Sequence, residues 1–256
     1  MVGKLLKHEL YRIARIAVIP AVAMIALAIL CRISLIGAAD SPELPAIITI
    51  FYIIAIVATL VVCAWVGIVR FYRTLFTGEG YMTLSLPVSA DQLLISKLLS
   101  SIIASLGGVV VCVLSALILL IGQGINITMI LDSIFSVLID FGVEIVNAGG
   151  GLYVFELVLL YILSIPMSFL LFYLVMAVAQ LFTTKNRTVI AVALYFGGAF
   201  VWSIIMSLVG NLIIYHALQV SVHLYMWIEI VFTIAVDLIS YFVVRYIIKN
   251  KVNLLT

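Results

Sequence analysis

The sequence predicts an all-α membrane protein that crosses the bilayer several times. Of its 256 residues, 66% are hydrophobic and 9% are charged, whereas ordinary soluble domains have about 25% charged residues. A chain of this composition cannot cover a folded surface with polar groups, so the bilayer must act as its solvent. Short polar segments separate long apolar ones, and lysine and arginine gather in alternate polar segments. These observations predict a single polytopic transmembrane domain over residues 1–256.

Six apolar segments have about the 20 residues that a helix needs to cross a bilayer. The predicted spans cover residues 16–38, 45–69, 98–121, 153–182, 189–213 and 224–248. Cys31, Cys63 and Cys112 are scattered singly through these spans. This distribution is typical of small core residues and not of a disulfide framework or a metal site.

The distribution of basic residues predicts the orientation of the chain. Basic residues precede span 1, flank the segment between spans 2 and 3, join spans 4 and 5, and follow span 6. They are Lys4, Lys7, Arg12, Arg15, Arg70, Arg73, Lys97, Lys185, Arg187, Arg245, Lys249 and Lys251. Residues 122–152 contain no lysine or arginine. The positive-inside rule therefore places both termini in the cytoplasm.

Residues 1–15 are predicted to form an amphipathic interfacial helix. Leu6, Leu10 and Ile13 recur at helical spacing, while the basic residues face the other way. A basic amphipathic helix usually lies in the plane of the membrane interface. A helix that binds a soluble partner is the alternative. A cleaved signal peptide is disfavoured, because the following apolar run exceeds the roughly 7–15 residues of a signal core.

Residues 77–97, between spans 2 and 3, are predicted to hold a short cytoplasmic helix, a proline and a capped second helix. Pro87 ends the short helix, because the residue before a proline is pushed out of helical space. Ser89 and Gln92 have the spacing of a capping box, which starts the second helix. The short helix carries more apolar side chains than a solvated helix of this length normally does. Its candidate functional residues are Glu79, Gly80, Tyr81, Met82, Leu84, Leu86 and Pro87.

The segment 125–146 is predicted to be an amphipathic extracellular helix between spans 3 and 4. Its polar residues recur about every fourth position, at Asp132, Ser136, Asp140, Glu144 and Asn147. Three of them are carboxylates, each of which would cost a few kcal/mol at mid-bilayer. A seventh span is therefore disfavoured.

Ionisable residues away from the cytoplasmic ends of the predicted spans are Arg32, Glu156, Glu229 and Asp237. Residues of this kind should face protein or water and find partners. One interpretation is interhelical pairing, with Arg32 bound to Glu156 or Glu229. The alternative is a polar translocation path or a proton relay. Separately, small residues at every fourth position of span 3 predict a close helix contact; they are Ala104, Gly108, Cys112 and Ala116.

The motifs of common enzymes and metal sites do not occur in the sequence. No G-x-x-x-x-G-K-[ST], H-E-x-x-H, G-x-S-x-G or C-x-x-C pattern is found. His8, His216 and His223 are far apart and are interpreted as solvated residues. The chain is therefore not expected to be an enzyme or to bind a metal, a cofactor or nucleic acid.

The chain resembles the permease subunits of ABC-2-type exporters over nearly its whole length. The resemblance rests on the N-terminal segment KLLKHELYRIAR and on the segment between spans 2 and 3. In that segment Glu79-Gly80, Leu84-Ser85-Leu86-Pro87 and the helix from Ser89 to Lys97 are similar to the family's pattern. Two features depart from it. Ala90 stands where the family often has a basic residue, and the long outer segment follows span 3, whereas better-known members have re-entrant helices after span 5.

The resemblance implies that the helix from Gly80 to Leu86 couples this permease to a separate ABC ATPase subunit, which would bind and hydrolyse ATP with Mg²⁺. It also implies a second permease, in a homodimer or a heterodimer. Compact bacterial permeases of this size resemble exporters of antimicrobial or cytolytic peptides, including phenol-soluble modulins. The expected cargo is an amphipathic or hydrophobic peptide or another lipophilic molecule, and the expected location is the bacterial plasma membrane.

Two other functions remain open from the sequence. The first is a proton-coupled secondary transporter that uses Glu229 and Asp237, although no internal repeat of the kind common in such folds is evident. The second is a membrane subunit for immunity or sensing that transports nothing.

Overall fold

Five long helices make up most of the described structure. The computed structural model describes residues 2–36, 43–76, 80, 88–120, 132, 136, 139–140, 143, 150–182, 190–191, 193–198, 200–201, 203–204, 207–208 and 222–250. The helices are α1 (Val2–Ile36), α2 (Glu43–Phe76), α4 (Ala90–Leu120), α6 (Gly151–Phe182) and α8 (Val222–Asn250). All other described residues except 88, 89 and 150 are also helical, so the all-α prediction is confirmed for this part of the chain.

Each of the five helices is long and apolar enough to cross a membrane, as expected of a multi-pass membrane protein. Their candidate spans are 28 to 33 residues long, which at 1.5 Å per residue gives about 42–50 Å against a hydrocarbon core of about 30 Å. In α4 only 11% of the most apolar window is buried. Apolar side chains therefore face outward, as they do when lipid is the solvent.

Two boundaries require comment. The basic segment 1–15, predicted as a separate interfacial helix, continues without a break into the first predicted span as α1. The predicted span 189–213 is described only in part, and its described residues between 190 and 208 are helical. Pro20 and Pro166 lie inside α1 and α6.

The chain forms two compact units. Unit 1 comprises residues 1–69 and 95–143, and unit 2 comprises residues 70–94 and 144–256. Helix α2 passes from unit 1 into unit 2 after Val69, and α4 passes back into unit 1 at Ile95.

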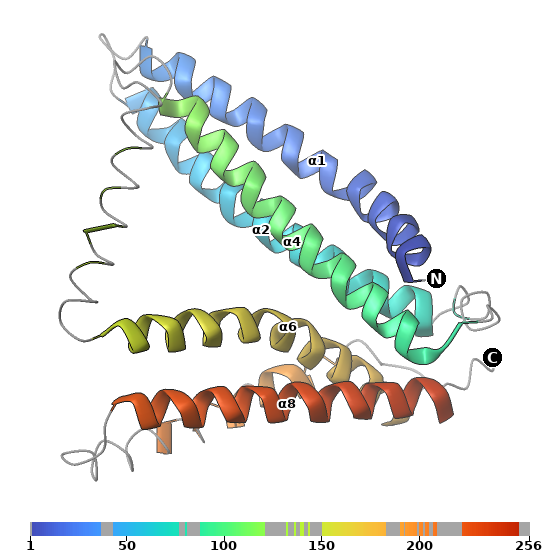
Figure 1. Cartoon of the computed structure of the whole chain (residues 1–256). Helices are drawn as coiled ribbons and strands as arrows, with labels where there is room; N and C mark the ends of the chain where they lie inside the picture. The colour runs from blue at the N-terminus through green and yellow to red at the C-terminus, as the bar shows by residue number, and fades with distance from the viewer. Residues whose placement is uncertain are drawn as a thin grey trace. The chain divides into compact units, whose positions relative to one another are not determined.

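In unit 1, α1, α2 and α4 lie side by side (Figure 1). Helix α4 is parallel to α1, because Glu9 contacts Lys97 and Met24 contacts Cys112, both at a sequence separation of 88. Helix α2 is antiparallel to α1, since the Cys31 Sγ lies 3.6 Å from the Thr49 Oγ1 across the connection.

In unit 2, α6 and α8 pack along each other and begin at the same end (Figure 1). Glu156 near the start of α6 contacts His223 at the start of α8. The chain between Phe182 and Val222 must therefore return to the end at which α6 starts. A span over residues 189–213 would supply this return.

Candidate functional site

The predicted coupling helix lies largely outside the described residues, but both of its flanks are described. Glu79, Tyr81, Met82, Leu84, Leu86 and Pro87 are outside the described part. Gly80 is described, and it is helical and buried. The contacts of α2 before the segment and of α4 after it therefore define the candidate site.

The start of α4 is capped as the sequence predicts. The Gln92 backbone N–H donates to the Ser89 Oγ at 3.3 Å, and the Ser89 N–H donates to the Gln92 Oε1 at 3.4 Å. Each side chain satisfies a backbone donor that the first turn of a helix leaves free. The capping box is confirmed, and it fixes where the segment ends.

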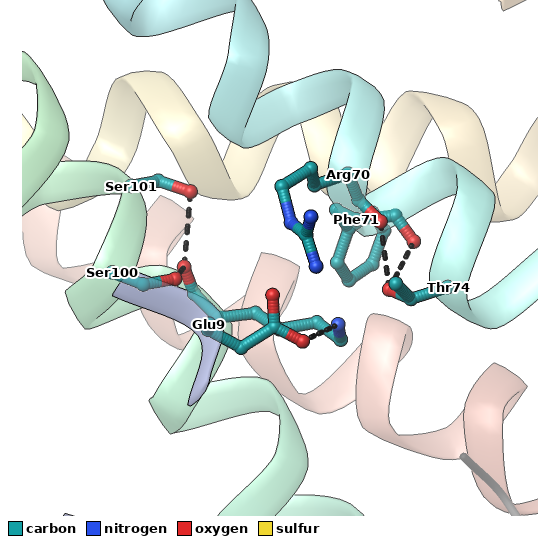
Figure 2. Close-up of polar contacts among 7 residues, drawn as sticks. Glu9, Arg70, Phe71, Thr74, Ser100 and Ser101 are labelled. Atoms are coloured by element: carbon teal, nitrogen blue, oxygen red, sulfur yellow. Dashed lines mark hydrogen bonds and ion pairs between the residues drawn. The ribbon is translucent and has the colours of Figure 1, made fainter. Parts of the chain in front are cut away.

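The end of α2 is held by aromatic packing against α6. The rings of Phe71 and Tyr173 stack with centroids 3.7 Å apart and an angle of 11°, and both side chains are buried. The Gln180 Nε2 donates to the Phe76 carbonyl at 3.4 Å, which provides a partner for one of the carbonyls that the last turn of α2 leaves free. Thr74 donates to the Arg70 carbonyl at 2.7 Å, as Figure 2 shows.

The beginning of α4 is held by α8. The Asp91 Oδ1 accepts hydrogen bonds from the Tyr241 hydroxyl and the Arg245 Nε, each at 2.8 Å. Asp91 also lies in the first turn of α4, where a carboxylate is favoured by the positive end of the helix dipole. The Asp91 and Arg245 side chains keep 33% and 42% of their surface exposed, so water can compete for the ion pair. We name the seven residues of these contacts the flank cluster: Phe71, Phe76, Asp91, Tyr173, Gln180, Tyr241 and Arg245.

The flank cluster joins both sides of the predicted coupling segment to the final turns of two neighbouring helices. Gln180 is two residues before the end of α6, and Arg245 is in the last two turns of α8. Phe76 is therefore attached to α6, and Asp91 is attached to α8. The sequence marked the capping box, the proline and the flanking basic residues of this region, including Arg245. It did not mark Tyr173, Gln180 and Tyr241 as partners, because nothing local distinguishes them.

In unit 1 the next turn of α4 carries a buried ion pair. The Lys97 Nζ lies 3.0 Å from the Glu9 Oε1, and the two side chains are 5% and 16% exposed. The Ser100 and Ser101 hydroxyls donate to the Lys97 carbonyl at 2.9 and 3.0 Å (Figure 2). Lys97 was predicted from its charge to bracket a cytoplasmic segment, whereas here it is a buried residue that joins α1 to α4.

The residues predicted for close helix packing lie on α4 in unit 1. Gly108 is buried, and an added Cβ would be 3.0 Å from both the Cβ and the Sγ of Cys63 on α2. The Cys112 Sγ lies 3.9 Å from the Met24 Sδ. Ala104 is partly buried and Ala116 is exposed.

The face of α4 that meets α2 follows a seven-residue spacing, through Ser101, Gly108 and Ser115. An added Cβ at Gly67 of α2 would lie 2.4 Å from the Ser101 Oγ. Tyr52 donates to the Ser115 Oγ at 2.9 Å, since the Ser115 hydroxyl itself donates to the Cys112 carbonyl. Steps of four residues drift by about 40° around a helix and steps of seven by only about 20°. The contact face therefore departs from the stripe of small residues towards Ala116.

The ionisable residues of the spans have different surroundings. Glu156 is buried, and its Oε2 lies 2.9 Å from the Nδ1 of His223. The His223 side chain is 40% exposed, so it is partly solvated, as predicted, and also contacts Glu156. Arg32 and Glu229 are partly buried. The Asp237 Oδ1 is buried and has no hydrogen-bond partner among the described residues.

The described residues contain no group of three or more histidine, cysteine or acidic side chains that could hold a metal ion. Comparison with models of known protein families, with curated proteins and with solved structures gave no match to this chain.

Proposed function

We propose that this chain is the permease subunit of an ATP-driven ABC exporter. It moves amphipathic or hydrophobic peptides, or similar lipophilic cargo, out of a bacterial cell. A separate ATPase subunit binds and hydrolyses ATP with Mg²⁺, and a second permease completes the pathway. The segment Gly80–Leu86 is the coupling element.

The flank cluster is the observation that carries this proposal. A segment that receives motion from a soluble ATPase must be attached to the spanning helices at both sides, or the motion would be lost in the connections. Here the preceding residue Phe76 is bonded to α6, and the following residue Asp91 is bonded to α8.

The proposal includes six spans with both termini in the cytoplasm. The parallel arrangement of α6 and α8 supports a crossing over residues 189–213. The described residues between 132 and 143 are helical, as the proposed amphipathic outer helix over residues 125–146 requires. Residues 1–15 extend the first span into the cytoplasmic interface.

Thiol labelling tests this topology. In a cysteine-free variant, cysteines at Ser41, Gln123 and Asn147 are expected to react with an impermeant reagent applied from outside. Cysteines at Thr77, Asn186 and Asn250 are expected to remain unlabelled. External labelling at position 250 together with protection at position 147 would refute the six-span arrangement.

Co-purification tests the coupling element. Tyr81→Ala combined with Leu84→Asp is expected to abolish co-purification of the ATPase encoded beside this chain, because truncating an aromatic anchor costs an interface a few kcal/mol. Membrane insertion should be unchanged. Tyr11→Ala is the control, since Tyr11 is 75% exposed on α1 and lies outside the segment. Normal ATPase binding and peptide export by the double variant would refute the proposal.

A proton-coupled secondary transporter is the second candidate, and the buried Oδ1 of Asp237 favours it. A carboxylate without a hydrogen-bond partner inside a spanning helix is a typical component of proton pathways. Proteoliposomes that contain only this chain would distinguish the two functions. Uptake driven by a pH gradient, abolished by Asp237→Asn, would favour the secondary transporter, whereas transport that requires the ATPase and nucleotide would favour the exporter.

A further inference from the structure

Unit 1 contains an apolar groove between α1, α2 and α4. Its volume is about 270 Å³. Leu10, Ala14, Ala17 and Ala21 form its wall on α1, and Gly107 lines it from α4. Its polar lining residue, Thr59, donates its hydroxyl to the Ala55 carbonyl at 2.8 Å. The groove therefore has no free polar group for a hydrophilic ligand among these lining residues.

The groove runs from the interfacial segment into the first predicted span. It extends along α1 from Leu10 to Ala21, which at 1.5 Å per residue is about 17 Å. This length, open along its side, is similar to that of one lipid hydrocarbon chain, since half of a hydrocarbon core of about 30 Å is about 15 Å.

The end of the groove that is nearer the N-terminus carries an exposed cation. Lys7 precedes Leu10 by three residues and Ala14 by seven, so it lies on the same face of α1, one turn beyond the groove. Lys4 is exposed one turn further on. An ammonium group at this position complements the phosphate of a lipid whose hydrocarbon chain lies below it.

Gly107 leaves open space on the α4 side of the groove, since an added Cβ there would meet no atom within 4 Å. A flexible hydrocarbon chain can fill this space without a polar partner.

We propose that the groove binds one acyl chain of an anionic phospholipid, drawn from the leaflet at the N-terminal end of α1, with the lipid phosphate at Lys7. The lipid fills the space between α1 and α4 that the small side chains leave open. Its binding would connect the lipid composition of the membrane to the packing of unit 1. The proposal does not depend on whether the chain is an exporter.

The first test measures lipid retention. The full-length chain is reconstituted in nanodiscs of phosphatidylcholine and phosphatidylglycerol, extracted in mild detergent and examined by native mass spectrometry. The unmodified chain is expected to retain one phosphatidylglycerol, and Gly107→Leu to lose it, because the leucine side chain occupies the groove. Gly198→Leu is the matched control, since an added Cβ there also meets no atom within 4 Å and Gly198 lies outside the groove.

The second test addresses the headgroup. Lys7→Glu is expected to lower the ratio of bound phosphatidylglycerol to phosphatidylcholine by about fivefold or more, the effect of one lysine near an anionic surface. Arg12→Glu makes the same charge change about 140° away around α1 and is expected to leave the ratio near that of the unmodified chain.

Three results would overturn the proposal. They are retention of phosphatidylglycerol by Gly107→Leu, equal retention of the two lipids by the unmodified chain, and a change of oligomeric state in Gly107→Leu without loss of lipid. The last result would assign the groove to a second copy of the chain.

Discussion

In unit 1, α2 and α4 meet through glycine, serine and cysteine, and a buried ion pair joins α1 to α4. In unit 2, the ends of α2 and α4 meet α6 and α8 through stacked rings, single hydrogen bonds and an ion pair open to water. The contact between α2 and α4 in unit 1 is close, because the two backbones approach where Gly67 faces Ser101. This close approach leaves little room for one helix to move against the other. The contact in unit 2 combines the buried rings of Phe71 and Tyr173 with an ion pair between Asp91 and Arg245 that is open to water. The attachment that water can loosen in unit 2 is therefore the one at the start of α4, next to the proposed coupling segment.

The largest effect is expected for Lys97→Met, which removes the buried ammonium that lies 3.0 Å from the Glu9 carboxylate. Removing one partner of a buried pair typically costs about 3–5 kcal/mol. We expect a loss of this size in the free energy of unfolding, measured by denaturant titration in detergent micelles. Glu9→Gln combined with Lys97→Met should recover part of this loss, because the double variant removes both charges of the pair. A small loss in the single variant would show that water reaches the pair.

Gly108→Leu is expected to lower the free energy of unfolding by about 1–3 kcal/mol, the usual cost of overpacking a close contact. The added atoms would meet Cys63 on α2, which has no room to move away. Ala116→Leu is the control on the same helix, since Ala116 is exposed and lies outside the groove, so the added atoms should change stability little. Equal stability of the two variants, by the same titration, would assign this face of α4 to lipid.

Tyr52→Phe is expected to cost about 0.6 kcal/mol, the average for a hydrogen bond between membrane helices. The Tyr52 hydroxyl donates to Ser115 in the buried contact between α2 and α4. A double-mutant cycle with Ser115→Ala isolates the interaction from the effect of each substitution alone. A coupling energy near zero would mean that Tyr52 contributes through packing only.

The smallest change in stability is expected for Arg245→Met, about 0.2–1 kcal/mol, because the pair with Asp91 is exposed and screened by salt. The effect of Arg245→Met on function should be larger. The proposed ATPase subunit should still bind, but added peptide should no longer stimulate its rate of ATP hydrolysis. Lys249→Met removes the same charge from the exposed last turn of α8 and should leave stimulation intact. Normal stimulation in Arg245→Met would show that the flank cluster does not transmit motion.

Local features of the chain were predictable because short-range physics decides them. The apolar segments had to become helices, since a bilayer offers no water to satisfy a free backbone. The capping box at Ser89 and Gln92 requires only residues three positions apart, and it formed as predicted. The burial of Cys31 and Cys63 likewise follows from small apolar side chains within spanning helices.

Long-range partners were decided by the tertiary structure alone. The pairing of Glu156 with His223, of Glu9 with Lys97 and of Asp91 with Arg245 joins residues 67 to 154 positions apart. Each carboxylate could pair with any of several basic residues in the sequence, and charge alone does not determine which of them it contacts. The choice follows from which helices become neighbours and in which register, and in a uniformly apolar chain the sequence pattern does not mark that register. Small residues such as Gly67 and Gly108 fix the register only after the two helices have come together. The backbones are then so close that one added Cβ would collide with the neighbouring helix.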